Sequence, residues 1–286
     1  MPSIAARLQS DLDALTERIA DLVRELSIEH FDRYSSSVVF IVPDYYWGEA
    51  TSEQLNDQLA IKRDYEEWFD IFKSVFAQAT DDLNRRIKKA DSRVRQWIEL
   101  KSNWSISQDR AANEEKLRAD AKLFYEMLAI LDANGPAATI LIPDTNAIIG
   151  EPSPIHYKSI ASDDTFVFLL LPTVLAELDA LKINHRNPDF RNKVNKVITR
   201  VKGWRNQGGL REGVTVDRTI TVKAVASEPQ MDNTLSWLDE NNRDDRIIAS
   251  VLEVQSTYPN ARVVLVTGDI NLSNKADVAR IETAEL

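Results

Sequence analysis

Apolar residues recur with helical spacing through the first part of the chain. From residue 8 to residue 26 they alternate at steps of four and three, which is the spacing of one stripe along a long helix with coiled-coil-like packing. The stripe consists of Leu8, Leu12, Leu15, Ile19, Leu22 and Leu26. Comparable patterns predict two helices between residues 52 and 101 and another from about residue 107 to residue 131. We therefore expect residues 1–134 to form an α-helical bundle.

Several details of this first part are expectations of the same kind. On the helix that begins near residue 52, the predicted buried face carries Leu55, Leu59, Tyr65, Phe69, Phe72 and Phe76. Aromatic residues in an amphipathic bundle usually lie in the core, so we interpret Trp68 as a core residue rather than a base-stacking platform, and Trp104 likewise. Residues 38–48 form either a short strand or a packed loop.

The pattern changes after Gly135 and Pro136, where short apolar runs begin to alternate with helical segments. The runs at residues 138–143, 166–171 and 262–267 predict buried parallel strands. Helices are expected from Pro172, over residues 184–205 and from about Arg243. Residues 215–225 alternate like one exposed or edge strand, and residues 228–242 read as a loop with a helical turn at residues 235–238. Residues 137–286 should therefore form an α/β domain with a central parallel sheet.

Composition narrows the classes of protein that this chain can belong to. A chain of 286 residues with 43% apolar residues can bury a sizeable core in two domains. It has no cysteine, which excludes disulfide scaffolds, thiolate zinc sites and cysteine nucleophiles. Neither a signal-peptide pattern nor an apolar run of membrane-spanning length is present, so we expect a cytoplasmic protein with no membrane partner.

Charge is distributed unevenly along the chain. The formal net charge of −10 argues against a protein that coats nucleic acid without specificity. Between residues 182 and 205, however, eight lysines and arginines face a single acid. Such a run is either a solvated helix face or a set of phosphate contacts, and both interpretations remain open. The candidate phosphate contacts are Lys193, Lys196 and Arg200.

Four acidic positions far apart in the sequence point to one end of the predicted sheet. Asp144 and Asp269 directly follow predicted strands, while Glu177 and either Asp244 or Asp245 fall in the first turns of predicted helices. In an open α/β sheet these positions share the rim at the carboxyl ends of the strands. Acids at strand ends and helix starts are often simple caps, but several carboxylates at one rim repel unless a cation neutralises them. Oxygen ligands select hard ions, so we expect Mg²⁺ or Mn²⁺.

In these motifs the sequence resembles the PIN-domain family of metal-dependent ribonucleases. The matching elements are Asp144-Thr145-Asn146 after an apolar strand, residues 172–179 with Glu177, Asp245 followed by Arg-Ile-Ile-Ala, and Val266-Thr267-Gly268-Asp269-Ile270-Asn271. They occur in the family's order over about residues 137–286 and cover none of the first 134 residues. The resemblance implies a three-layer α/β/α sandwich that hydrolyses phosphodiester bonds, usually in RNA.

The resemblance also implies roles for individual residues. Asp144, Glu177, Asp245 and Asp269 would be the metal-binding and catalytic carboxylates, while Asn146 and Thr267 would donate hydrogen bonds to ligand or substrate oxygens. The family's spacing selects Asp245, whereas the position of the apolar stripe on the predicted helix slightly favours Asp244.

Two other functions fit the same residues. The metal chemistry would equally serve a nuclease for DNA or DNA flaps, because no residue must contact a 2′-hydroxyl group. Alternatively, the chain is a non-catalytic interaction protein with a vestigial PIN domain. In either case the N-terminal helices are expected to mediate self-association or contact with a protein partner.

Overall fold

The computed structural model describes residues 3–30, 44–102, 106–132 and 138–286. The chain divides into two compact units, a helical unit made of residues 5–72 and 78–133 and an α/β unit made mainly of residues 134–286. Gly135, Pro136, Trp104 and residues 38–43 lie outside the described residues. Within the described ranges, no helix is both long enough and apolar enough to cross a membrane.

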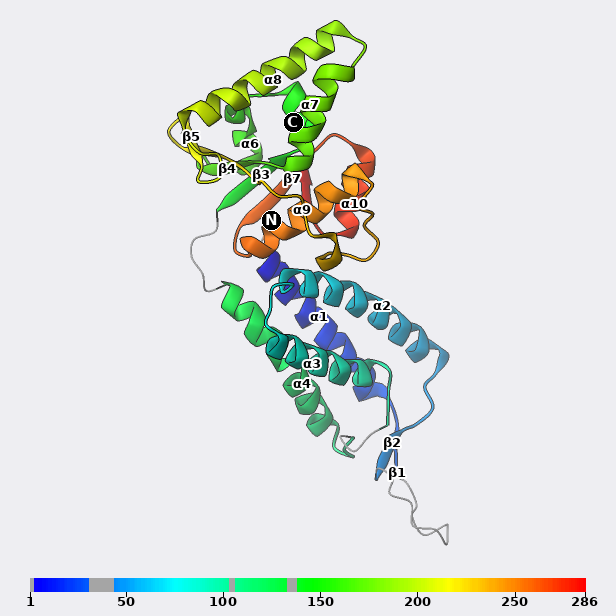
Figure 1. Ribbon diagram of the computed structural model, residues 1–286. Helices are drawn as coiled ribbons and strands as arrows, with labels where there is room; N and C mark the ends of the chain where they lie inside the picture. The colour runs from blue at the N-terminus through cyan, green and yellow to red at the C-terminus, as the bar shows by residue number, and fades with distance from the viewer. Residues whose placement is uncertain (1–2, 31–43, 103–105, 133–137) are drawn as a thin grey trace. The chain divides into compact units, whose positions relative to one another are not determined.

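The helical unit contains the four long helices that the apolar pattern predicted (Figure 1). They are α1 (Ile4–Glu25), α2 (Ser52–Val75), α3 (Asp81–Ile98) and α4 (Arg110–Asp132). Two short strands, β1 (Ile28–His30) and β2 (Tyr45–Trp47), pair antiparallel after α1 and before α2. The predicted stripe of α1 is buried, and each of its six residues is at most 5% exposed. This stripe is therefore part of the chain's own core and is not available for self-association.

Aromatic side chains fill the core of the helical unit. Trp68 is fully buried, and its indole N–H donates to the carbonyl oxygen of Leu8 at 2.9 Å. Its ring lies 5.1 Å from that of Phe72 and 5.4 Å from that of Phe124, measured between centroids. The interpretation of Trp68 as a core residue is confirmed.

The predicted buried face of α2 is wrong at its beginning. Leu55 and Leu59 are 46% and 64% exposed, whereas Ile61 and Trp68 are buried. At about 100° per residue, the face around Ile61, Trp68 and Phe72 points well away from the two leucines. Leu55 and Leu59 fit the apolar spacing of the predicted face, but no other helix packs over them in the described structure.

The α/β unit is built on a six-stranded sheet with the order β5-β6-β4-β3-β7-β8. All neighbouring strands are parallel except β5 and β6. The three predicted strands occupy the centre of the sheet as β3 (Thr139–Pro143), β4 (Phe166–Leu170) and β7 (Arg262–Val266). The remaining strands are β5 (Val214–Val216), β6 (Ile220–Ala224) and β8 (Glu282–Ala284). The predicted central parallel sheet is confirmed.

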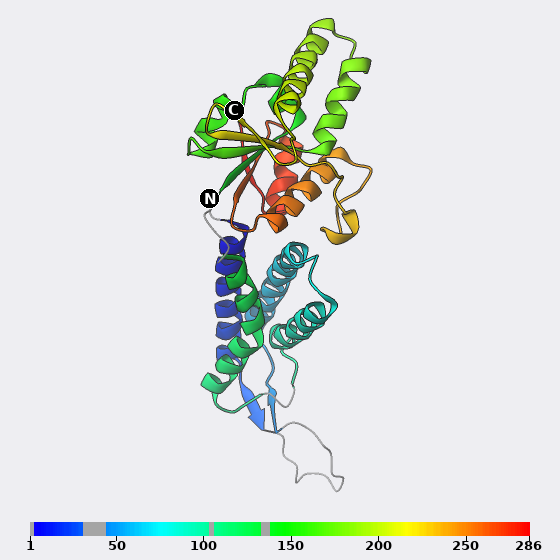
Figure 2. The same ribbon diagram turned by 60° about the vertical axis from the view of Figure 1, so that its left-hand side comes forward.

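Helices cover both faces of this sheet, which gives the expected α/β/α sandwich (Figures 1 and 2). On one face lie α5 (Thr145–Gly150), η2 (Pro154–Tyr157), α6 (Lys158–Ala161), α7 (Pro172–Asn184) and α8 (Pro188–Gln207). On the other face α9 (Arg243–Thr257) packs against α10 (Ile270–Val278). This division follows from right-handed crossovers, because the strand order extends from β3 first toward β6 and then back toward β8.

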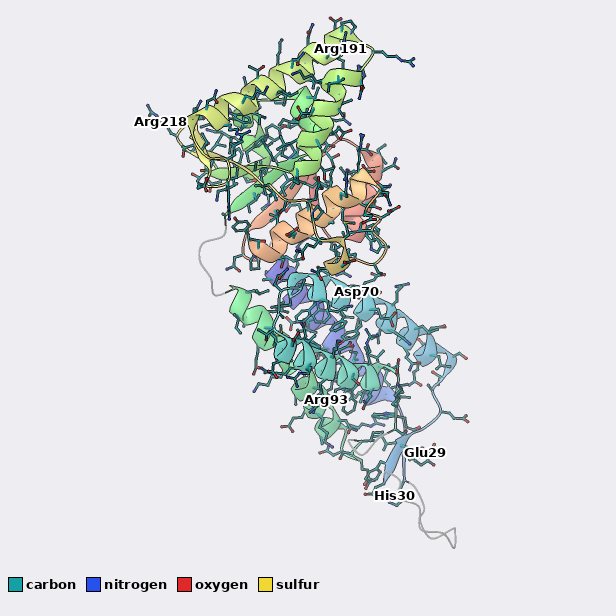
Figure 3. All side chains as sticks on the ribbon, in the orientation of Figure 1. Glu29, His30, Asp70, Arg93, Arg191 and Arg218 are labelled. Carbon is teal, nitrogen blue, oxygen red and sulfur yellow. The ribbon has the colours of Figure 1, made fainter. Side chains whose placement is uncertain are left out.

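One predicted detail of this unit needs correction. Residues 215–225 form a hairpin rather than one edge strand, and β6 lies inside the sheet between β5 and β4. Its turn places Asp217 and Arg218 at φ of 49° and 60°, and Arg218 projects outward at the tip (Figure 3). A turn with two positive φ values favours Asn-Gly or Asp-Gly, so the Asp-Arg pair carried no clear signal. The turn expected at residues 235–238 is present as a single hydrogen-bonded turn, in which the N–H of Leu238 donates to the carbonyl oxygen of Leu235 at 3.1 Å, and a 3₁₀ turn, η3 (Met231–Asn233), precedes it.

Candidate active site

Asp144 lies at the carboxyl end of β3, where the strand passes into α5. It caps α5, since its Oδ1 accepts a hydrogen bond from the backbone N–H of Ala147 at 2.6 Å. The hydroxyl group of Thr267, which directly follows β7, donates to Oδ2 of Asp144. Because β3 and β7 are parallel neighbours with Pro143 opposite Val266, the sheet register itself brings these two residues together.

The carboxylate of Asp144 is buried, which disfavours its ionised form. Only 4% of the residue is exposed. Burial raises the pKa of Asp144; hydrogen bonds from Thr267 and from backbone N–H groups oppose this rise, whereas the negative charge of Asp269 adds to it, and the pKa stays raised. A positive charge placed near Asp144 would stabilise its ionised form.

Asp269 is linked to Asp144 through Thr267. The same Thr267 hydroxyl accepts a hydrogen bond from the backbone N–H of Asp269 at 2.9 Å. Asp269 in turn caps α10, with Oδ1 accepting from the N–H of Asn271 at 2.8 Å. One threonine thus fixes the positions of two of the four predicted carboxylates.

Glu177 reaches the same rim from α7. Its Oε2 accepts a hydrogen bond of 2.7 Å from the hydroxyl of Thr145, the residue after Asp144. Its Oε1 lies 2.9 Å from the guanidinium Nη1 of Arg243, the first residue of α9. Glu177 therefore connects the start of α5 to the start of α9.

Of the two adjacent aspartates on α9, Asp245 faces inward. It is 5% exposed, and its Oδ1 lies 2.7 Å from the ammonium group of Lys275 on α10. Its Oδ2 accepts a hydrogen bond of 3.0 Å from the backbone N–H of Asp239, which belongs to the predicted loop before the helix. Asp244 is more exposed, and its carboxylate lies 3.6 Å from Lys275. The inward position matches the residue that the PIN-like spacing selected.

Two of the four acids at this rim are paired with the chain's own cations, Glu177 with Arg243 and Asp245 with Lys275. In the ranges that the structure describes, no three histidine, aspartate or glutamate side chains stand close enough together to hold one metal ion. The available donors are nevertheless all carboxylate and hydroxyl oxygens, which suit a hard divalent ion. Burial raises the pKa of Asp144, so a positive charge beside it would favour the ionised carboxylate.

The sequence was compared with models of known protein families to find the family of the α/β unit. The sequence matches the PIN domain over residues 141–286, just over half of the chain. The chain belongs to the PIN-domain family. PIN domains are generally nucleases, and they typically use divalent metals. A search of curated proteins found no match.

The sequence analysis did not predict the two basic residues that pair with acids at this rim, Lys275 and Arg243. Lys275 is the only basic residue of α10, and Arg243 is the first residue of α9. A cation at a helix N-terminus opposes the helix dipole, so Arg243 needs a compensating anion, which Glu177 supplies. That unfavourable position was a signal in the sequence, whereas Lys275 gave none.

The residues predicted to contact nucleic acid lie in two different settings. Thr267 is buried, and its hydroxyl already serves Asp144 and Asp269, so it positions carboxylates. Asn146 is exposed at the start of α5. Lys193, Lys196 and Arg200 are exposed on α8.

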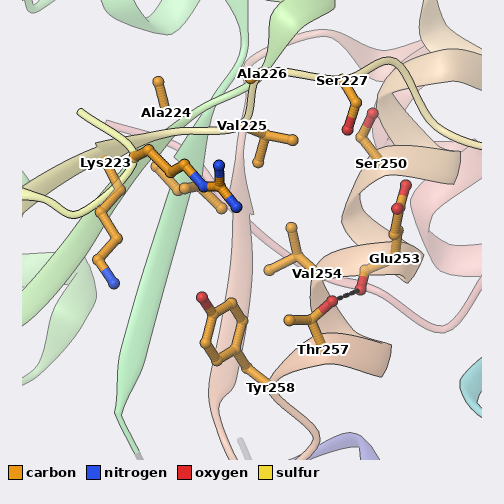
Figure 4. Close-up of a pocket in the computed structure, with 12 residues that line it drawn as sticks. Lys223, Ala224, Val225, Ala226, Ser227, Ser250, Glu253, Val254, Thr257 and Tyr258 are labelled. Carbon is orange, nitrogen blue, oxygen red and sulfur yellow. Dashed lines mark hydrogen bonds between the residues drawn. The ribbon is translucent and has the colours of Figure 1, made fainter. Parts of the chain in front are cut away.

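A separate cavity of about 430 Å³ lies between the end of β6 and α9 (Figure 4). Lys223 comes from the strand side of this cavity, and Glu253 and Tyr258 come from the helix side. The Thr257 hydroxyl donates to the backbone oxygen of Glu253 at 2.8 Å. None of the described residues that line this cavity is one of the four predicted carboxylates. The cavity is therefore distinct from the candidate active site of the PIN domain.

Proposed function

We propose that the PIN domain of this protein is a metal-dependent endonuclease that cleaves single-stranded RNA. The observation that carries this proposal is the convergence of four acids from β3, α7, α9 and β7 at one rim, with Asp144 buried among hydrogen-bond donors. Those acids are Asp144, Glu177, Asp245 and Asp269. A cap alone would account for Asp144 or Asp269, but not for the buried Asp245 on α9 or for Glu177 on α7.

Each carboxylate has a separate task in this proposal. Asp144 would be the central ligand of a Mg²⁺ or Mn²⁺ ion, because a nearby cation would stabilise its buried negative charge. Asp245 and Asp269 would complete the set of oxygen ligands, and Glu177 would orient the attacking water. When bound, the ion supplies positive charge for the phosphoryl oxygens and lowers the pKa of a bound water.

The chain's own residues prepare this geometry. Thr267 fixes the rotamer of Asp144 and the backbone of Asp269 at the same time. Thr145 holds Glu177 next to Asp144. Such support matters because catalytic groups need to be held close to their productive positions before substrate arrives.

The basic helix α8 would contact the phosphates of the substrate through Lys193, Lys196 and Arg200. This assignment limits nucleic-acid binding to one face of an otherwise acidic protein. The cysteine-free composition agrees with a reducing compartment, and we assign the activity to the cytoplasm.

The helical unit would supply contacts to a protein partner or a second copy of the chain. The buried stripe of α1 does not support this role. The exposed Leu55 and Leu59 of α2 do, since they present apolar surface at two successive turns of a helix.

A cleavage assay tests the nuclease proposal directly. Labelled single-stranded RNA and DNA of the same sequence are incubated with the full chain in Mg²⁺, in Mn²⁺ and in EDTA. We expect metal-dependent cleavage of RNA that Asp144→Asn abolishes. The exposed Asp232 provides the matched control, and Asp232→Asn should cleave like the unaltered protein.

The other outcomes of this assay have defined meanings. Cleavage of DNA in preference to RNA would make the protein a DNA nuclease with the same chemistry. Cleavage that persists in EDTA, or in Asp144→Asn, would contradict the proposed mechanism. A folded protein without activity on either strand would support a non-catalytic interaction protein.

A further inference from the structure

An open groove of about 840 Å³ runs along α8. Its α8 wall includes Asn192, Asn195, Lys196, Thr199, Arg200 and Gly203, and Pro152 forms part of the opposite wall. Steps of three and four residues place all of these α8 positions on one face of the helix. At 1.5 Å per residue, the stretch from Asn192 to Gln207 is roughly 22 Å long.

This face has the regular spacing of a buried stripe but carries polar side chains. Asn192, Thr199 and Arg200 are exposed, while the core face of the same helix uses Val194 and Val197. Within the part of the chain that the structure describes, no side-chain hydrogen bond or ion pair occupies the amides of Asn192 and Asn195, or Lys196. These groups therefore remain available to a ligand.

Gly203 lines the groove within α8, at a position where glycine disfavours the helix. Glycine inside a helix is destabilising relative to alanine. A Cβ atom at Gly203 would meet no atom within 4 Å, so packing does not require glycine there. The absence of a side chain at Gly203 leaves free space in the groove, next to the buried Trp204 in the lining.

The short helix α5 lies in the chain between the candidate active site and the groove. This helix begins directly after Asp144, ends at Gly150 and packs against α8, and Pro152 follows it into the groove wall. Its six residues span roughly 9 Å. A strand that leaves Asp144 along α5 would therefore reach the groove within a short distance.

Electrostatics also connects the two walls. Burial raises the pKa of the Glu151 carboxyl group. A hydrogen bond from His156 and other contributions, among them the positive charge of Arg200, together outweigh the effect of burial, and the pKa is lowered. The carboxylate of Glu151 lies 2.7 Å from Nδ1 of His156. Arg200 thus faces the segment after α5 without forming an ion pair with it, and its guanidinium group can still bind a phosphate.

We propose that this groove binds a single nucleic-acid strand that continues from the active site and reads its bases, with a preference for adenine. The inference rests on the proposed nuclease function and adds the substrate's specificity to it. Lys196 and Arg200 would hold phosphates. The amides of Asn192 and Asn195 would pair with base edges, since a carboxamide matches the neighbouring donor and acceptor of adenine. A single strand is the expected ligand because its base edges are unpaired and accessible.

Binding measured without cleavage tests this proposal. Fluorescence anisotropy in EDTA follows the full chain with oligo(A), oligo(U) and oligo(C) of equal length, as RNA and as DNA. We expect oligo(A) to bind about tenfold more tightly than oligo(U) or oligo(C). Asn192→Ala combined with Asn195→Ala should remove this preference, while the salt dependence stays the same.

Gly203→Leu is the sharpest variant because it should not damage the fold. Leucine favours helix formation and would extend into open space, so thermal stability should be equal or higher. The same side chain fills the groove, and binding of oligo(A) should weaken about tenfold or more, since a ligand that cannot enter loses its base contacts.

Two matched charge reversals locate the phosphates. Arg200 lines the groove and Lys202, on the same helix, does not. Arg200→Glu should weaken binding. It should also lower the slope of the logarithm of the binding constant against the logarithm of the salt concentration by about one or more. Lys202→Glu should leave that slope unchanged.

Three results would overturn the proposal: Gly203→Leu binding oligo(A) like the unaltered protein, the double asparagine variant retaining the base preference, or equal effects of Arg200→Glu and Lys202→Glu. The nuclease function is judged separately, by cleavage in metal. Groove-dependent binding without cleavage would reject only that function. Cleavage with unchanged binding in Gly203→Leu would reject only the groove.

Discussion

Lys275→Met should destabilise the fold when no divalent ion is present. The ammonium group of Lys275 lies 2.7 Å from Oδ1 of Asp245, and the two side chains are 26% and 8% exposed. Burial lowers the pKa of Lys275, but its contacts with Asp245 and Asp244 outweigh this effect and the pKa is raised, so the lysine is charged at neutral pH. Methionine keeps much of the side-chain volume and removes the charge.

The magnitude follows from the carboxylate left behind. Removing one partner of a fully buried ion pair costs about 3–5 kcal/mol. Water reaches Lys275, and Asp245 keeps its hydrogen bond from Asp239 at 3.0 Å, so we expect a smaller loss of about 2–3 kcal/mol. Asp245→Asn added to Lys275→Met should restore most of this stability, because a neutral amide needs no counter-charge.

Urea unfolding of the full chain in EDTA measures this loss. The exposed Lys182 on α7 is the matched control, and Lys182→Met should change the free energy of unfolding by no more than about 0.5 kcal/mol. Repeating the measurement in Mn²⁺ should narrow the gap between Lys275→Met and the unaltered protein, since a bound cation replaces the missing charge. The reasoning would be refuted if Lys275→Met were as stable as the unaltered protein in EDTA, or if Asp245→Asn made it still less stable.

Three further predictions concern the carboxylates and the helical unit. The pKa of Asp144 is raised above its usual 3.8, so the folded protein binds the carboxyl proton more tightly than the unfolded chain does, and ionisation of Asp144 lowers the stability of the fold as the pH rises. Asp144→Asn should therefore need more urea to unfold than the unaltered protein at neutral pH in EDTA. This prediction would be contradicted if the difference in stability did not shrink as the pH falls toward 3.8. Asp245→Asn should abolish cleavage while Asp244→Asn keeps a measurable fraction, and the reverse order of activities would exchange their roles. Light scattering of the full chain should show an assembly larger than one chain that Leu59→Glu disperses; a monomer in the unaltered protein would reject self-association.

Much of the fold follows from local patterns. Apolar runs that stop at Asp144 and before Gly268 mark parallel strands, because a strand buried on both faces has no alternation to interrupt it. The buried stripe of α1 follows in the same way from a four-three spacing. The hairpin at Asp217 escaped prediction because its turn lacks the glycine that usually marks two positive φ values.

The placement of the four acids at one rim was also accessible from sequence, because the carboxyl ends of parallel strands and the helices that follow them meet there. For the choice between Asp244 and Asp245 the helical wheel and the family spacing pointed in opposite directions, and the spacing, which selected Asp245, was given more weight; the role of Asp245 as a metal ligand stays a prediction. Packing of α9 against α10 places Asp245 inward beside Lys275.

Local sequence thus determines where helices, strands and their terminal carboxylates occur, because periodicity, capping and strand ends depend on near neighbours. Only the tertiary structure decides that Leu59 stays exposed, that Lys275 and Arg243 pair with Asp245 and Glu177, and that Pro152 and α8 line a groove beside Gly203. These features depend on segments distant in sequence that come together when the chain folds, and the apolar and polar pattern of one segment carries no information about the charge or shape that another will place against it.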